Sequence, residues 1–160
     1  MNNQDVYLSE AIDVIEEILN GGGEFQMYPR GISMLPLIVQ ERDSVVLKKR
    51  SGPPARKWDI AFYRRENGQF VLHRVMKVCQ DGTYVMCGDN QISFEKNVLP
   101  EQIIGYVDQL YRKGKKVSFR SLRYKVYVFF WTFMPYRCAI KGFKKILRLI
   151  KKKLFGHNEG

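Results

Sequence analysis

The stretch "WDIAFYRRENGQFVLHRVMKVCQDGTYVMCGDN", residues 58–90, decides the fold class. It holds three mostly apolar runs separated by an Asn-Gly and an Asp-Gly dipeptide, which are strong signals for tight β-hairpin turns. If each turn has two residues, counting outward from both turns places Phe62 and Asn90 on either side of His73. The stretch therefore predicts a three-stranded antiparallel meander with His73 in its middle strand.

The position of Asp89 depends on that register. Strict alternation turns Asp89 to the face opposite to His73, beside Arg74, because successive side chains of a strand point to opposite faces. A one-residue bulge, for which Gly88 is a suitable place, would instead bring Asp89 to the His73 side of the sheet. The residues alone leave both arrangements open.

The segments around this meander predict a mostly β protein that begins with a helix. Residues 5–19 repeat apolar side chains at helical spacing, and "NGGG" at 20–23 ends that helix because glycine accepts a positive φ. The runs "EFQMYPR", "SVVLKK" and "IIGYVDQLYRK" indicate further strands. We expect three parts: a helix with its glycine cap at residues 1–23, a β domain at 24–112 and a basic tail at 113–160.

The segment "GISMLPLI", residues 31–38, holds one hydroxyl among apolar residues. Gly31 permits an unusual φ or a close approach of the backbone, and Pro36 stiffens the exit of the segment. Such constraints would hold a nucleophilic Ser33 and its backbone N–H in a fixed arrangement. The alternative is that Ser33 only starts a turn.

A serine hydroxyl attacks a peptide carbonyl only when a base takes its proton. The chain has two histidines, and His157 lies in the polar C-terminal end. His73 stands between Val71 and Val75 on a mostly apolar strand, where an imidazole can act as a general base near neutral pH. The alternative is that His73 is a half-buried sheet residue with a hydrogen-bonded ring.

The motifs "GISMLP", "DSVVL", "WDIAFYR", "VLHRVMKV", "MCGDN" and "IIGYV" resemble, in order and interval, the type I signal peptidase and LexA-like serine peptidase superfamily over residues 25–110. "LHRV" resembles the endoplasmic-reticulum and archaeal-type branch with a histidine base, while "GISMLP" is closer to the mitochondrial inner-membrane type. The resemblance implies that family's coiled β-sheet fold, with Ser33 as nucleophile and His73 as base. It also implies that Asp89, in the "GDN" box, is the supporting aspartate.

Two positions depart from the family's pattern. Many signal peptidases carry a hydroxyl residue two positions before the nucleophile, where it helps to form the oxyanion hole. Gly31 stands there in this chain, so backbone N–H groups, including that of Ser33, are expected to take that role. Members also tend to carry a second aspartate five or six residues after the first, and here Glu95 is the possible supporting acid.

Charge is distributed unevenly along the chain. Residues 1–110 carry 12 Lys and Arg against 15 Asp and Glu, whereas residues 111–160 carry 15 against one. In 137–155, apolar side chains recur on one helical face with lysines on the other, and an aromatic run precedes this segment. The pattern predicts that residues 121–155 bind an anionic membrane surface. The alternative is that the apolar face packs on the domain itself.

Cysteine usage and the apolar runs indicate the compartment. The cysteines, Cys79, Cys87 and Cys138, lack metal-ligand spacing and predict neither a disulfide framework nor a metal site, so we expect a reducing compartment. No Lys or Arg precedes Arg30, and we expect no cleaved signal peptide. The longest apolar run, nine residues at 126–134, is shorter than the ~20 that a spanning helix needs. With the basic tail, these features predict a peripheral protein on the cytoplasmic face of a membrane.

The predicted function is that of a membrane-associated serine endopeptidase that cleaves precursor peptides by a Ser-His mechanism without a cofactor. By the resemblance, the substrate is an extended peptide with small residues near the cut, paired along a sheet edge. The alternative is a catalytically inactive peptide- or membrane-binding module of the same fold, which Gly31 and Glu95 favour. Nucleic acid is not an expected partner, although the tail interleaves basic and aromatic residues.

Overall fold

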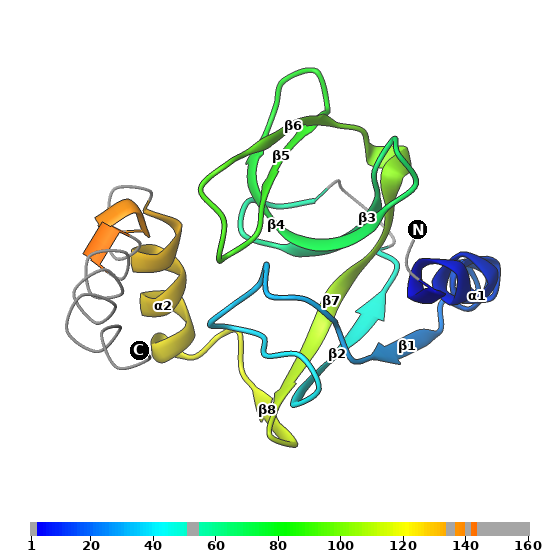
Figure 1. Cartoon of the computed structure of the whole chain (residues 1–160), viewed down its shortest axis with the longest axis horizontal. Coiled ribbons are helices and arrows are strands. Elements are labelled where there is room, and N and C mark those ends of the chain that lie inside the picture. Colours follow the sequence, from blue (N-terminus) through cyan, green and yellow to red (C-terminus); the bar gives the residue numbers. More distant parts are fainter. Residues whose placement is uncertain (1–2, 51–54, 134–136, 140–141, 144–160) are drawn as a thin grey trace, which may run out of the picture.

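The computed structural model of the chain describes residues 3–50, 55–133, 137–139 and 142–143 (Figure 1). The described residues are mostly β, as predicted, and form an eight-stranded antiparallel sheet of order β1-β2-β7-β3-β4-β5-β6 with β8 paired to β7. The elements in chain order are α1 (Asn3–Asn20), β1 (Glu24–Met27), β2 (Asp43–Lys48), β3 (Ile60–Arg64), β4 (Phe70–Val78), β5 (Tyr84–Cys87), β6 (Glu95–Val98), the short 3-10 helix η1 (Pro100–Gln102), β7 (Ile103–Arg112), β8 (Lys115–Val117) and α2 (Leu122–Thr132).

Helix α1 forms where the apolar spacing predicts it. Ile12, Ile15 and Leu19, spaced by three and four residues, are buried against the sheet. The helix ends in a glycine cap: Gly22 has a φ of +81°, and the N–H of Gly23 donates to the carbonyl of the fifth residue back at 2.9 Å. This cap turns the chain directly into β1.

Both hairpins of residues 58–90 form, but each turn has three residues rather than two. The Arg65 N–H donates to Gln69 O at 2.9 Å, and Gly68 has a φ of +83°; the second hairpin repeats this arrangement with Gly82 at +85°. This is the three-residue hairpin loop in which glycine takes the left-handed position after a type I turn. Each extra residue shifts the register of the meander by one.

The shifted register changes the neighbours of the central strand. His73 faces Ala61, and not Phe62 as predicted from two-residue turns. On the other side of β4, Arg74 faces Cys87. The prediction that His73 lies in the middle strand is confirmed, since β4 pairs with both β3 and β5.

Two apolar clusters fill the interior. Cys87, which is buried, and Cys79 and Cys138 are free thiols. The first cluster includes α1, β2, β7 and part of the loop that carries Ser33. The second cluster is formed mainly by β3 to β6, which Figure 1 shows curving round into an arch. Its buried members are Ala55, Ala61, Tyr63, Val75, Tyr84, Met86, Val98 and Ile103.

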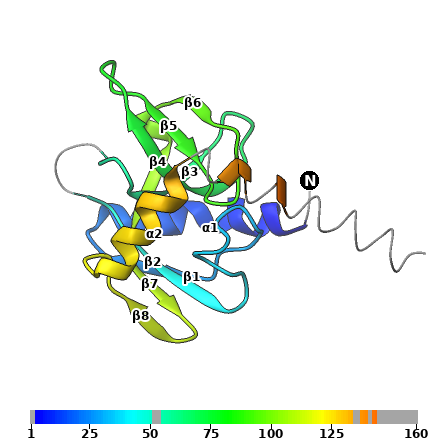
Figure 2. The ribbon, with the colours of Figure 1, turned by 90° about the vertical axis from the view of Figure 1, so that its left-hand side faces the viewer.

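Helix α2 lies on the side of the sheet opposite to α1, as the two views in Figures 1 and 2 agree. Ser121 caps its N-terminus, because the Ser121 hydroxyl accepts a hydrogen bond from the Tyr124 N–H at 3.3 Å. In the part of the chain that the structure describes, no helix is long and apolar enough to cross a bilayer. Most of the amphipathic helix predicted at 137–155 lies outside the described residues.

Candidate active site

The Ser33 loop, residues 28–42 between β1 and β2, is anchored by its apolar residues. Met34, Leu37 and Ile38 are buried in the first apolar cluster, and the Ile38 N–H donates to Met34 O at 3.0 Å. These anchors explain why one hydroxyl stands among apolar residues in the sequence. They fix the backbone of the loop and leave Ser33 half-buried at its edge.

The 88–91 segment, which follows β5, is bonded to the Ser33 loop. The Asn90 N–H donates to Ser33 O at 2.7 Å, and the Asn90 side-chain amide donates to the preceding carbonyl of the loop at 3.0 Å. Gly88 lies between this loop and His73. A Cβ built on Gly88 would be 2.6 Å from Ser33 O and 3.1 Å from His73 Cδ2, so this approach requires glycine. The Ser33 backbone and one edge of the imidazole therefore both lie close to Gly88.

The opposite edge of the His73 ring faces a carboxylate. His73 is 1% exposed, and its Nδ1 lies 3.0 Å from Glu95 Oε1 and 3.1 Å from Tyr63 Oη. The Tyr63 hydroxyl donates to Glu95 Oε2 at 2.8 Å. Arg65 donates to both carboxylate oxygens, from Nε to Oε2 at 2.8 Å and from Nη2 to Oε1. The arch of β3 to β6 brings these side chains together, since Glu95 begins β6 whereas Tyr63 lies in β3.

This hydrogen-bond network assigns the tautomer of the imidazole. A carboxylate only accepts hydrogen bonds, and the Tyr63 hydroxyl already donates its proton to Glu95. The proton of a neutral His73 therefore sits on Nδ1, between Glu95 and Tyr63. The unprotonated nitrogen is Nε2, which is bonded to the Cδ2 atom that faces Gly88.

The electrostatic surroundings favour a neutral imidazole beside an ionised carboxylate. Burial lowers the pKa of His73 below its ordinary value of 6.5 and outweighs the nearby charge of Glu95, which raises it. Burial alone would raise the pKa of Glu95, but the hydrogen bonds from Arg65 and Tyr63 outweigh it and hold that pKa below its ordinary value of 4.5. At neutral pH, His73 is therefore uncharged and able to accept a proton.

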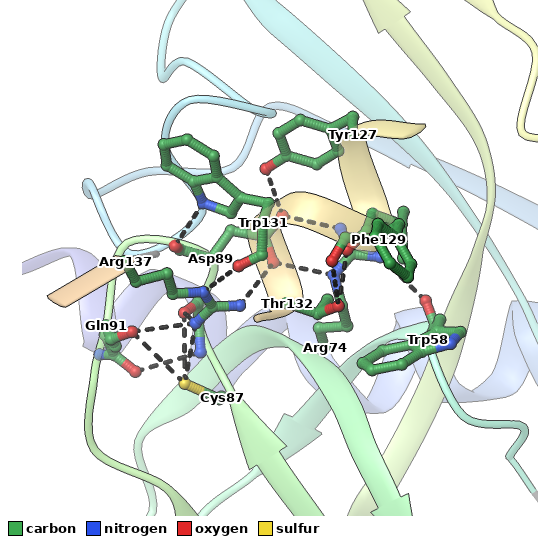
Figure 3. Close-up of polar contacts among 12 residues, drawn as sticks. Trp58, Arg74, Cys87, Asp89, Gln91, Tyr127, Phe129, Trp131, Thr132 and Arg137 are labelled. Carbon is green, nitrogen blue, oxygen red and sulfur yellow. Dashed lines mark hydrogen bonds and ion pairs between the residues drawn. The ribbon is translucent and has the colours of Figure 1, made fainter. Parts of the chain in front are cut away.

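Asp89 forms a buried ion pair with Arg74, as strict alternation of the strand predicts, and does not take the place beside His73 that the family resemblance implies. Arg74 donates from Nε to Oδ1 at 2.8 Å and from Nη2 to Oδ2 at 2.7 Å, and both side chains are fully buried (Figure 3). Successive residues of β4 point to opposite faces, and the register shift between β4 and β5 lies within β4 rather than at Gly88. The structure therefore places Glu95, the other acid considered for this role, and not Asp89, against the imidazole.

Helix α2 and Arg137 hold the 88–91 segment from outside. The Tyr127 hydroxyl donates to Asp89 Oδ2 at 2.8 Å, and Trp131 Nε1 donates to Asp89 O at 2.7 Å. The buried guanidinium of Arg137 donates from Nη1 to two carbonyls of the segment, at 3.1 and 2.9 Å (Figure 3). These contacts fix the 88–91 segment, which in turn donates hydrogen bonds to the Ser33 loop.

The oxyanion donors predicted at Gly31 and Ser33 have different surroundings. Gly31 has a φ of +87°, which favours glycine, and its N–H donates to Gln40 Oε1 at 2.8 Å. Because the Gly31 N–H is already used, the Ser33 N–H is the remaining candidate of the two.

Sequence reasoning missed Tyr63, Arg65 and Arg137. Tyr63 could have been found from a correct hairpin register, because it lies two residues beyond Ala61, on the same face of β3 as the residue opposite His73. Arg65 follows the end of β3, and its contact with Glu95 depends on the curvature of the sheet. No spacing in the sequence points to the contact between Arg137 and the 88–91 segment.

A scan against protein-family models and searches of curated proteins and of solved structures each find no match to this chain. Membership of the signal peptidase superfamily therefore stays a prediction from the motifs.

Proposed function

We propose that the chain is a serine endopeptidase in which Ser33 is the nucleophile, His73 the general base and Glu95 the acid that orients the imidazole. The placement of His73 carries this proposal: Nδ1 is 3.0 Å from Glu95, and the opposite edge of the ring faces Gly88 and the Ser33 loop. A general base needs an uncharged form near working pH and a basic atom turned toward the proton that it takes. Burial, which lowers the pKa of His73, supports the first requirement, and the position of Cδ2, the neighbour of Nε2, beside Gly88 supports the second.

In acylation, Ser33 Oγ bonds to the carbonyl carbon of the substrate while its proton passes to His73 Nε2. The tetrahedral intermediate collapses when the C–N bond breaks and Nε2 gives the proton to the leaving amine. Water then attacks the acyl-serine, with Nε2 taking and returning a proton in the same way, which releases the carboxylic acid product and Ser33. Glu95 remains ionised and stabilises the imidazolium that forms in each half of the reaction.

The oxyanion of each tetrahedral intermediate needs a hydrogen-bond donor close to Ser33. We assign this role to the Ser33 N–H, because Gln40 takes up the N–H of Gly31. One such donor typically contributes a factor of about 10²–10³ in kcat. The motif resemblance points to an extended peptide substrate with small residues near the cut.

The test is incubation of the purified full chain with a library of exported-protein precursors, with mass spectrometry of the products. Ser33→Ala and His73→Ala are each expected to remove discrete cleavage, because base catalysis alone contributes about 10²–10⁴ in rate. Ser118→Ala and His157→Ala are the matched controls and should cleave normally. Cleavage that survives His73→Ala would contradict the assigned base, and precursors that bind without being cut would identify a peptide-binding module.

Gly88→Ala is expected to lower kcat/KM by about 10²-fold or more, since a displacement of 1 Å at a catalytic group can have that effect. The added Cβ would lie 2.6 Å from Ser33 O, so the Ser33 loop or the 88–91 segment must move. Gly142→Ala is the control, because a Cβ there meets no atom within 4 Å. Equal cleavage rates for the two variants would show that the contact between Gly88 and Ser33 does not position the nucleophile.

A further inference from the structure

Helix α2 has an exposed apolar face. Its members follow the spacing i, i+4, i+7, i+8 and i+11, which places the first four on one side of α2 and the last at the C-cap of the helix. This outer face consists of Leu122, Val126, Phe129, Phe130 and Phe133, which are 76%, 45%, 73%, 52% and 61% exposed. Contiguous exposed apolar side chains of this size mark a surface that binds something.

The opposite face of α2 is fixed to the domain. Arg74 donates to the Tyr124 hydroxyl at 3.1 Å, and Tyr127 and Trp131 donate to Asp89. Tyr124, Tyr127 and Trp131 belong to the aromatic run of the sequence that predicts membrane binding, yet their polar groups contact the protein. The outer face therefore cannot turn inward without breaking hydrogen bonds to a buried ion pair.

Cations border the outer face. Arg123 and Lys125 are exposed on α2, one on each flank of the apolar side chains. On the Lys125 flank, a cavity of about 470 Å³ opens between α2 and the sheet, with Phe119 and Phe129 in its wall and Lys57 also lining it. Lys57 is exposed, and its Nζ lies 4.3 Å from the centre of the Trp58 ring. Two ammonium groups thus stand beside this recess, whose lining also includes Asp59, a carboxylate paired with Arg50 at 2.6 Å.

We propose that the outer face of α2 docks into the interface of an anionic lipid bilayer, with the cavity beside it accepting a lipid whose phosphate lies between Lys57 and Lys125. Aromatic and aliphatic side chains bordered by cations are the pattern of a helix that lies in the headgroup region of a membrane. The inference does not depend on the peptidase proposal, since none of these side chains belongs to the Ser33 and His73 site.

Charge complementarity selects the bilayer over other occupants. Residues 111–160 carry 15 Lys and Arg against one acidic residue, so a second copy of this face, or the chain's own C-terminal residues, would bring cations against Arg123 and Lys125. An anionic surface instead attracts both flanks, and each Lys or Arg near such a leaflet strengthens binding about fivefold.

Docking also has a consequence for the site on the inner side of α2. The helix that would contact lipid is the same one that holds the 88–91 segment through Asp89. The bilayer would therefore fix the orientation of the Ser33 loop relative to the membrane plane.

The experiment places an environment-sensitive NBD fluorophore at Phe129→Cys in the full chain. The background carries Cys79→Ser and Cys138→Ser, because these two thiols are accessible whereas Cys87 is buried. Val14→Cys is the matched control, since Val14 is 57% exposed on α1, on the opposite side of the molecule. Each labelled protein is mixed with phosphatidylglycerol vesicles or phosphatidylcholine vesicles that contain a nitroxide-labelled lipid.

We expect a blue shift and nitroxide quenching at position 129 with anionic vesicles, neither signal with neutral vesicles, and neither at position 14. Replacing Lys57 and Lys125 by Gln should weaken the partitioning about 25-fold, from the fivefold effect of each cation. Vesicle binding that leaves the label at 129 in water would overturn the proposal and assign binding to the rest of the basic tail. A blue shift at 129 without lipid would also overturn the proposal. If the protein is then a dimer, a second copy covers the outer face; if it is a monomer, the chain's own C-terminal residues cover it.

Discussion

Asp89→Asn is expected to lower the free energy of unfolding by about 3–5 kcal/mol, the range found when one partner of a buried ion pair is removed. Both side chains of the Asp89–Arg74 pair are fully buried, and Arg74 donates to both carboxylate oxygens. The substitution leaves the guanidinium buried without its counter-charge. It also weakens the hydrogen bond from Tyr127, so α2 should lose part of its attachment.

The measurement is equilibrium denaturation of the wild type and of two variants. Glu24→Gln is the matched control, because the Glu24–Lys48 pair is 44% and 41% exposed and such a pair contributes at most about 1 kcal/mol. Asp89→Asn and Glu24→Gln should therefore differ severalfold in their effects. If Asp89→Asn proves as mild as Glu24→Gln, the buried pair does not hold α2 and the 88–91 segment on the sheet.

Glu95→Gln is expected to lower kcat/KM by about 10²–10⁴-fold, the scale of losses when the partner of a catalytic imidazole is neutralised. Glu95 is 27% exposed, and its ion pair with Arg65 lies partly in solvent, so the change in stability should stay near 1 kcal/mol. Kinetics on a precursor identified by the library would measure the loss. Glu66→Gln, in the exposed hairpin loop, is the control.

The pH profile separates an electrostatic role of Glu95 from a purely structural one. Only neutral His73 acts as a base, so kcat/KM should fall as the pH drops through the pKa of His73, which burial holds below 6.5. Glu95 raises that pKa and Arg65 lowers it, so Glu95→Gln should move the acid limb to lower pH while the plateau falls. A plateau that falls without any movement of the acid limb would mean that Glu95 does not act on the imidazole.

The hairpins could be predicted from the sequence, but their register could not be fixed. The Asn-Gly and Asp-Gly dipeptides locate both turns correctly, because glycine is needed where φ is positive. The same dipeptides occur in two-residue and three-residue turns, and the choice shifts every pairing by one. This single residue decides whether Phe62 or Ala61 faces His73, and with it whether Tyr63 is recognised as a neighbour of the imidazole.

Of the candidate site, the sequence indicated Ser33 and His73 but not which acid supports the base. Strict alternation already places Asp89 beside Arg74, and the structure follows that arrangement. Glu95 belongs to a short strand without an apolar pattern, and it reaches His73 only because β3 to β6 curve round. Sheet curvature comes from packing across the whole domain, which local spacing does not report.

The role of α2 shows a similar limit. The aromatic run reads as one surface in the sequence, but the fold divides it between two faces. Tyr127 and Trp131 use their polar groups to bind Asp89, whereas Phe129 and Phe133 remain exposed. Residues with an apolar body and a polar end suit either environment, so only the buried ion pair beneath the helix decides which face turns inward.

General-base catalysis by His73 requires a neutral ring with an unprotonated Nε2, the nitrogen next to the Cδ2 atom that faces Gly88, and ¹⁵N NMR of the imidazole measures this protonation state. At neutral pH we expect His73 to carry its proton on Nδ1 and Nε2 to be unprotonated, and we expect the ring to titrate only below 6.5. The signals of His157, the other histidine of the chain, serve as the reference with which those of His73 are compared. A proton on Nε2 in the neutral ring, or a charged imidazole at neutral pH, would rule out His73 as the base, because neither form can take the proton of Ser33 at Nε2.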